Sequence, residues 1–308
     1  MSLRISVGSL RTIDLTNAYM NSKPDNSGIP ESGIDETGPS ETPESPSSPA
    51  TALPDGRMAS SQSAITSEQA FQLDDQSMAM VSEESSPQEL VAWGLRRFLD
   101  QKKIMTTSFG MEGCTLIDMC SKTIEQNDLP KLHVAWIDTG FFFPETHQLR
   151  EKLESKYSNI EIVRWATEVS PEKQTETYGD ELWKNNPNLC CNIRKVVPMK
   201  ENIGGFDIWM TGLRRSQTEA RAQTPILTWD WRYQLLKFCP LAAWTRADVW
   251  QYVQQNEVPF NQLHLQNFPT ISCFHCTRSV PGSTPDSDTR DGRWEGNDKD
   301  ECGLHFSI

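Results

Sequence analysis

The sequence lacks the features of a membrane, secreted or nucleic-acid-binding protein. No apolar run approaches the ~20 residues that a membrane-spanning helix requires. The first residues, MSLRISVGSLRTIDL, contain neither the continuous apolar segment nor the cleavage site of a secretory signal. Basic residues are not in excess, since the net charge is −13. We therefore expect a cytoplasmic protein that contacts neither membrane nor nucleic acid.

Apolar residues are also scarce, at 36% of 308 residues, and the shortage is greatest near the N-terminus. Residues 1–86 carry 13 acidic and 4 basic residues, and the stretch from Thr37 to Asp55 is dense in Pro, Ser, Thr and Glu. Such a composition buries too little apolar surface to offset chain entropy. We expect residues 1–84 to form a disordered, acidic, Ser/Pro-rich extension with at most a short helix at Ala70–Val81. An α/β domain should follow over residues 85–276, and a C-terminal tail over 277–308.

Order begins with a helix whose start is clearly marked. Ser86 suits the N-cap, Pro87 the first turn, and Glu89 completes a capping box. The apolar residues that follow at helical spacing are expected to face the core. They are Val91, Leu95, Phe98 and Leu99.

Apolar segments and amphipathic segments then alternate along the chain. Strands are expected at 104–108, 132–137, 160–165 and 206–211, and helices at 114–123 and 145–155. Strands that are apolar throughout predict a parallel sheet with helices on both faces. In such sheets ligands bind beyond the carboxyl ends of the strands, so the residues at those ends are candidates for a site.

Two of these strand ends carry polar or flexible residues. Thr106 to Cys114 (TTSFGMEGC) offers hydroxyls, a glycine and a helix start, which is typical of a backbone anion site, although no Walker A sequence is present. Asp138, Thr139 and Gly140 end the second strand. Their spacing fits a contact to ribose or adenine and equally fits a role in shaping the turn.

A third strand end carries the strongest anion-binding signal. Gly212 would let a ligand approach the backbone, and Arg214, Arg215 and Arg221 follow it closely. Arginine forks match the geometry of phosphate and sulfate. We expect part of this group to bind an anion, and at least one arginine to be an ordinary solvated charge.

Eight cysteines in a chain without a secretory signal indicate metal-binding or catalytic thiols. Cys190–Cys191 and Cys273–Cys276 form two pairs that suit zinc or an iron–sulfur cluster, and spacing alone leaves both open. Three others, Cys114, Cys120 and Cys239, lie in apolar segments and are expected to be core thiols.

Cys302 differs from the other cysteines because it stands in a polar terminus. A reactive thiol needs a cationic neighbour to become a thiolate, and His305, Arg290 and Arg293 are the candidates nearby. We interpret Cys302 as a nucleophile on a mobile tail.

Seven motifs in order make the chain resemble the assimilatory adenylyl-sulfate reductases, within the wider family that reduces adenosine 5'-phosphosulfate (APS) or its 3'-phosphorylated form (PAPS). The motifs are SFG at 108–110, DTGFFFPET at 138–146, CCNIRK at 190–195, TGLRRSQ at 211–217, CFHCTR at 273–278, RDGRW at 290–294 and ECGLH at 301–305. The resemblance implies a Rossmann-like domain of the adenine nucleotide α-hydrolase type with a flexible C-terminal catalytic tail. It also extends to this chain the homo-oligomeric state common in that family.

The resemblance further implies a reaction in which APS and reduced thioredoxin give sulfite, AMP and oxidised thioredoxin. Cys302 would attack the sulfate sulfur and expel AMP, with His305 beside it, and thioredoxin would then release sulfite from the S-sulfocysteine. The chain contains no thioredoxin-like Cys-x-x-Cys unit, so we expect the reductant to be a separate protein.

The family's [4Fe–4S] ligands correspond to Cys190, Cys191, Cys273 and Cys276, which favours an APS-type enzyme. Its substrate contacts, with Arg214 added from the strand-end argument, correspond to Ser108, Phe109, Gly110, Ile137, Lys195, Gly212, Arg214, Arg221, Arg290 and Arg293. Three alternatives stay open: PAPS reduction or dual specificity, an ATP pyrophosphatase-type transferase such as a tRNA thiolase, and a non-enzymatic zinc module.

Overall fold

The computed structural model describes residues 81–305. The expected extension and the short helix at Ala70–Val81 therefore lie almost wholly outside the described residues. Where the description starts, residues 81–85 form bends and a turn, and Glu83 makes an ion pair of 2.6 Å with Arg215.

Six strands form one sheet with the order β3-β2-β1-β4-β6-β5. The strands are β1 (Lys103–Thr107), β2 (Leu132–Asp138), β3 (Ile160–Ala166), β4 (Ile208–Thr211), β5 (Leu227–Asp230) and β6 (Leu235–Phe238). All neighbouring pairs are parallel except β5 with β6, which are antiparallel. The predicted parallel sheet is confirmed for its first four strands, whereas the edge hairpin β5–β6 was not predicted.

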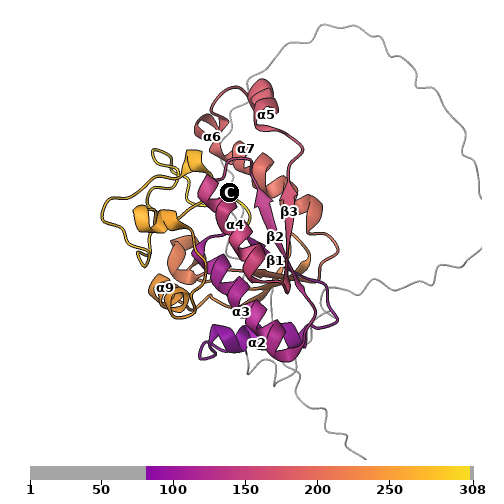
Figure 1. Cartoon of the computed structure of the whole chain (residues 1–308). Helices are drawn as coiled ribbons and strands as arrows, with labels where there is room; N and C mark the ends of the chain where they lie inside the picture. Colours follow the sequence, from indigo (N-terminus) through magenta and orange to yellow (C-terminus); the bar gives the residue numbers. More distant parts are fainter. Residues whose placement is uncertain (1–80, 306–308) are drawn as a thin grey trace, which may run out of the picture. The chain divides into compact units, whose positions relative to one another are not determined.

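Helices connect the strands. The longer ones are α2 (Pro87–Arg97), α3 (Met111–Asn127), α4 (Pro144–Lys156), α5 (Pro171–Tyr178) and α9 (Arg246–Gln255). Short helices α6 (Leu182–Asn185), α7 (Pro187–Cys191) and α8 (Val197–Asn202) follow α5, with a π-helical turn η1 (Asn192–Val196) between α7 and α8. Figure 1 shows α5, α6 and α7 grouped beyond the ends of β2 and β3. Short 3-10 helices are η2 (Arg215–Gln217), η3 (Glu219–Arg221), η4 (Gln262–Gln266) and η5 (Phe274–Cys276).

The first helix forms as its capping signature predicts. Ser86 accepts a hydrogen bond from the backbone N–H of Glu89, and the Glu89 carboxylate accepts one from the Ser86 backbone. The prediction for Leu99 is wrong: this side chain is 46% exposed, because α2 ends at Arg97 and the chain turns there. Leu90 takes the fourth place on the buried stripe instead.

The core lies on the sheet and reaches to the C-terminal tail. Ile104, Ala135 and Trp209 come from three adjacent strands and belong to one buried cluster. Leu304 of the tail packs against the same cluster, so apolar contact helps to hold the segment that carries Cys302. Within residues 81–305, no helix is both long enough and apolar enough to cross a membrane.

Candidate active site

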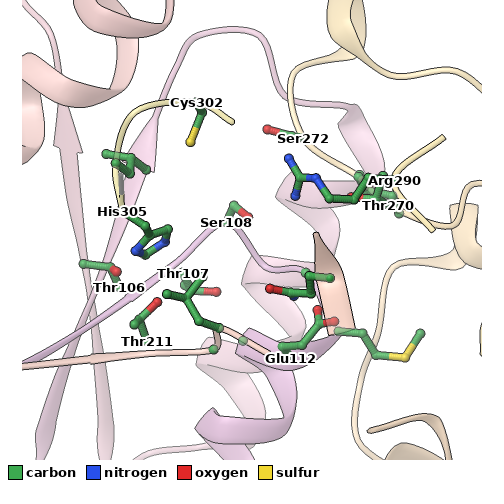
Figure 2. Close-up of a pocket in the computed structure, with 18 of the residues that line it drawn as sticks. Thr106, Thr107, Ser108, Glu112, Thr211, Thr270, Ser272, Arg290, Cys302 and His305 are labelled. Atoms are coloured by element: carbon green, nitrogen blue, oxygen red, sulfur yellow. The ribbon is translucent and has the colours of Figure 1, made fainter. Parts of the chain in front are cut away.

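A cavity of about 180 Å³ lies where β1, β2 and β4 end, and both the strand-end loops and the C-terminal tail line it. The structure brings together there ten of the residues singled out from the sequence. They are Ser108, Gly110, Ile137, Lys195, Gly212, Arg221, Arg290, Arg293, Cys302 and His305. Figure 2 shows Cys302 and His305 on one side of this pocket and Arg290, Thr270 and Ser272 on the other, with Ser108 between them.

Two predicted substrate contacts are not among the lining residues. Phe109 is 1% exposed and packs on Trp136 with ring centres 5.7 Å apart. Its positive φ of 57° turns its side chain into the core while Ser108 and Gly110 stay at the pocket. Arg214 is also buried, and its guanidinium donates to Glu112 at 3.0 Å and to Asp288 at 2.9 Å. These carboxylates occupy the edge of Arg214 that an anionic ligand would need.

Asp138 shapes its turn, which was one of the two roles left open. Its Oδ1 accepts from the backbone N–H of Gly140 at 2.9 Å, and its Oδ2 accepts from Arg164 Nε at 2.7 Å. Both carboxylate oxygens are therefore engaged within the protein.

The pocket carries a concentration of positive charge. Burial, together with the neighbouring guanidinium groups of Arg221 and Arg293, lowers the pKa of Arg290 to about 10. Lys195 is also buried and donates to Ser272 Oγ at 3.1 Å. Cations held this close together favour an anionic ligand.

The thiol of Cys302 lies half-buried among these cations. Burial alone would raise its pKa, but Lys195, the backbone N–H of Leu304 and Arg221 outweigh it, so the pKa of Cys302 is below its usual value. A depressed pKa increases the thiolate fraction, which is the nucleophilic form. Cys302 thus has the environment of a reactive thiol.

His305 is not the cation that activates Cys302. It stacks on Trp209 with ring centres 5.0 Å apart. Burial and then Lys237 and Arg221 hold the pKa of His305 well below its usual value, so the ring is neutral at pH 7. The cation that lowers the pKa of Cys302 most is Lys195, which was not among the three neighbours considered from the sequence.

Several residues that anchor the tail were missed from the sequence. Glu301 accepts two hydrogen bonds of 2.6 Å from Arg221, and Arg232 donates to the carbonyls of Gly303 at 2.8 Å and Leu304 at 2.6 Å. Arg232 lies in the turn of the unpredicted β5–β6 hairpin. An arginine in a short polar turn gives no signal of a partner some seventy residues away.

The four paired cysteines meet at a second, smaller cavity. Cys190, Cys191, Cys273 and Cys276 line it together, and all eight cysteines are free thiols. Burial, together with the neighbouring thiols of Cys191 and Cys273, raises the pKa of Cys190 to about 12. Cys114, Cys120 and Cys239 are fully buried in the core, as predicted.

The helix type changes directly after the adjacent cysteines that line this cavity. The π-helical turn η1 follows Cys191 directly, and such turns are frequently found at functional sites. Across residues 81–305, no group of three or more His, Cys, Asp or Glu side chains has the arrangement that a metal ion needs. The donor set itself, four free thiols around one cavity, fits sulfur-ligated iron or zinc.

These features define an enzyme class: an α/β domain with a cationic pocket at the strand ends and a nucleophilic thiol on a tail. Residues 102–279 match the model of the phosphoadenosine phosphosulfate reductase domain. The chain belongs to this family.

Relatives and solved structures agree with this assignment. The chain is 37% identical over 238 residues to the adenosine 5'-phosphosulfate reductase of Halalkalibacterium halodurans, covering 77% of this chain and 99% of that protein. It is 41% identical to adenosine 5'-phosphosulfate reductase 2 of Bacillus subtilis, covering 70% and 88%. Among solved structures, the PAPS reductase of Candida auris in complex with phosphate has 27% identity and a TM-score of 0.55, covering 68% of this chain and 99% of that one.

Proposed function

We propose that this chain reduces APS to sulfite and AMP, with thioredoxin as the electron donor, in assimilatory sulfate reduction. The observation that carries the proposal is the half-buried Cys302 thiol, with a lowered pKa, in a pocket lined by Lys195, Arg290 and Arg293. The relatives named above, which are called APS reductases, support the choice of substrate.

In the first step, the Cys302 thiolate attacks the sulfate sulfur of APS. The bond between that sulfur and the bridging oxygen breaks, AMP leaves, and an S-sulfocysteine remains. Lys195 and the two tail arginines, Arg290 and Arg293, would stabilise the negative charge on the phosphate and sulfate oxygens. The Ser108–Gly110 loop, at the start of α3, would receive the phosphate.

In the second step, a thioredoxin thiolate attacks Cys302 Sγ and releases sulfite. The mixed disulfide is resolved by thioredoxin's second thiol, so that one dithiol supplies two electrons and Cys302 returns to its reduced form. Cys302 must become accessible for this step, which requires the tail to leave its half-buried position.

We further propose that Cys190, Cys191, Cys273 and Cys276 hold a [4Fe–4S] cluster. Four thiols around one cavity, three of them buried and that of Cys276 half-buried, are a suitable donor set, and Lys195 lies one helical turn after Cys191. When bound, the cluster would supply an electrostatic contribution near the sulfate end of the pocket. Iron and sulfide analysis of anaerobically purified protein tests this, and stoichiometric zinc without iron would replace the cluster with a structural zinc site.

The experiment for the activity is intact mass spectrometry after anaerobic incubation with APS or PAPS, without thioredoxin. We expect one SO₃ group on Cys302 from APS, located by peptide mapping, and its loss on addition of reduced thioredoxin. Labelling by PAPS at an equal or greater rate would change the substrate assignment. No adduct with either nucleotide, in folded protein, would refute the covalent mechanism.

A further inference from the structure

Glu301 connects the residue before Cys302 to the wall of the pocket. Its carboxylate accepts from Arg221 Nε and Nη2, both at 2.6 Å, and from the Thr218 hydroxyl at 3.1 Å. Both charged side chains are buried, with 5% of each residue exposed. Paired in this way, a guanidinium and a carboxylate fix each other's orientation as well as distance.

The residues after Cys302 are held from a different element. Arg232 donates to the carbonyl oxygens of Gly303 and Leu304, and Tyr233 donates its hydroxyl to the Leu304 carbonyl at 3.4 Å. Cys302 therefore sits between two anchors. The anchor after Cys302 consists of hydrogen bonds to backbone carbonyls, whereas the anchor before it is the Glu301–Arg221 ion pair. A substitution that removes the charge of Glu301 therefore weakens only the anchor before Cys302.

The closed tail also limits the room in the pocket. The cavity of about 180 Å³ has Cys302, Leu304 and His305 among its lining residues. Pockets that take drug-sized ligands measure roughly 300–1,000 Å³. With the tail closed, the pocket is below that range, so admission of APS would involve outward movement of the tail, and the site would then need contacts that restore the tail's position.

We propose that Glu301 is a positioning residue: through its ion pair with Arg221 it returns the tail to the pocket and places Cys302 Sγ for attack on the sulfate sulfur. The inference rests on the proposed function and adds a role for a residue that touches neither the sulfate nor the nucleotide. Arg221 acts in the same pair and also donates from Nη1 to Gln217, and both of these residues line the pocket.

The proposed role of Glu301 affects the two half-reactions differently. Attack on APS requires the closed tail, and misplacing a reacting atom by about 1 Å can cost roughly 100-fold in rate. Attack by thioredoxin requires the open tail. Loss of the ion pair should therefore slow sulfonation of Cys302 without slowing the release of sulfite.

The change in charge at position 301 would by itself favour the Cys302 thiolate, which is the opposite of the slower sulfonation that we expect. The Glu301 carboxylate raises the pKa of Cys302, whereas Arg221 lowers it. Replacement of Glu301 by Gln removes the negative charge and leaves Cys302 at least as ionised as before. A slower reaction of the variant thus reports position and not a shortage of thiolate.

The test compares Glu301→Gln with wild type and with Glu83→Gln in anaerobic rapid-quench experiments at saturating APS. Glu83 is a matched control, because it forms a two-point ion pair with Arg215 at the surface. We expect the rate of S-sulfocysteine formation to fall by tens of fold or more in Glu301→Gln and to change by less than about twofold in Glu83→Gln. The affinity for AMP and the discharge of preformed adduct by thioredoxin should stay near wild type in both.

A double substitution tests the pair itself. Lysine at position 221 keeps the charge but cannot form the fork, so Arg221→Lys should also slow sulfonation. The Glu301→Gln/Arg221→Lys protein should be no slower than the slower single variant, since both remove one interaction. Additive effects, or an AMP affinity that falls as far as the sulfonation rate, would overturn the inference.

A ligand-free measurement keeps the inference testable if wild type forms no adduct, the result that would refute the proposed function. Cys302 alkylation by a bulky neutral maleimide and by small iodoacetamide is followed by peptide mapping. The ratio of bulky to small reagent reports tail opening independently of ionisation. It should rise several-fold in Glu301→Gln, and an unchanged ratio would overturn the proposal.

Discussion

Replacement of Glu112 by Gln should strongly destabilise the domain. Glu112 is 9% exposed in the first turn of α3, and its Oε1 accepts from Arg214 Nε at 3.0 Å and from Arg246 Nη1 at 2.9 Å. Removal of one partner from a buried charge pair costs about 3–5 kcal/mol. Arg214 keeps Asp288, and Arg246 keeps backbone carbonyl acceptors, so we expect about 3 kcal/mol. For a domain of this size the loss lowers Tm by about 6–12 °C.

The assay is thermal unfolding of the full chain at pH 7, followed by circular dichroism, with Glu83→Gln as the control. The Glu83 side chain is 62% exposed, and surface pairs of this kind contribute about 0–1 kcal/mol. Equal Tm values for the two variants would refute the reasoning, because burial would then not separate one ion pair from the other.

Three further outcomes follow from the same contacts. Gly113→Ala places a Cβ 2.2 Å from Thr107 Oγ1 and should cost about 1–3 kcal/mol in unfolding free energy, whereas Gly204→Ala, with nothing within 4 Å, should not; thermal unfolding of both checks this. Burial would raise the pKa of Glu112, but Arg246 and Arg214 outweigh it and hold this pKa below its usual value. The stabilisation of the fold by ionised Glu112 is therefore present above about pH 4.5 and is lost as the pH falls further. Denaturant unfolding against pH should show this loss in wild type and less of it in Glu112→Gln. Leu95→Ala should cost about 2–5 kcal/mol and Leu99→Ala less than about 0.5 kcal/mol, and equal losses would contradict the burial of the one and the exposure of the other.

The central part of the sheet could be predicted because its strands are apolar throughout and bounded by polar turns. β1, β2 and β3 were each placed within about a residue of their observed bounds. The β5–β6 hairpin was not predicted because each strand has only four residues. β5 is half-buried along its whole length, and its pattern of apolar and polar residues is too short to indicate a strand.

The arginines show where sequence reasoning about a site stops. Arg214 and Arg221 lie in the same loop and have the same chemistry, so their spacing gave both the same role. Their partners are distant in sequence: Glu112 and Asp288 for Arg214, and Glu301 for Arg221. Only the tertiary structure decides which guanidinium faces a cavity and which is enclosed by carboxylates.

The ion pairs around the pocket suggest why a dianionic phosphosulfate suits it. Within residues 81–305, no carboxylate lies within ion-pair distance of Lys195, Arg290 or Arg293. Three cations face one thiolate, and the phosphate and sulfate of APS would bring two further negative charges. A 3'-phosphate would add about 1.5–2 further negative charges, and the lining residues offer no further unpaired cation to match them. We therefore expect charge balance to favour APS over PAPS.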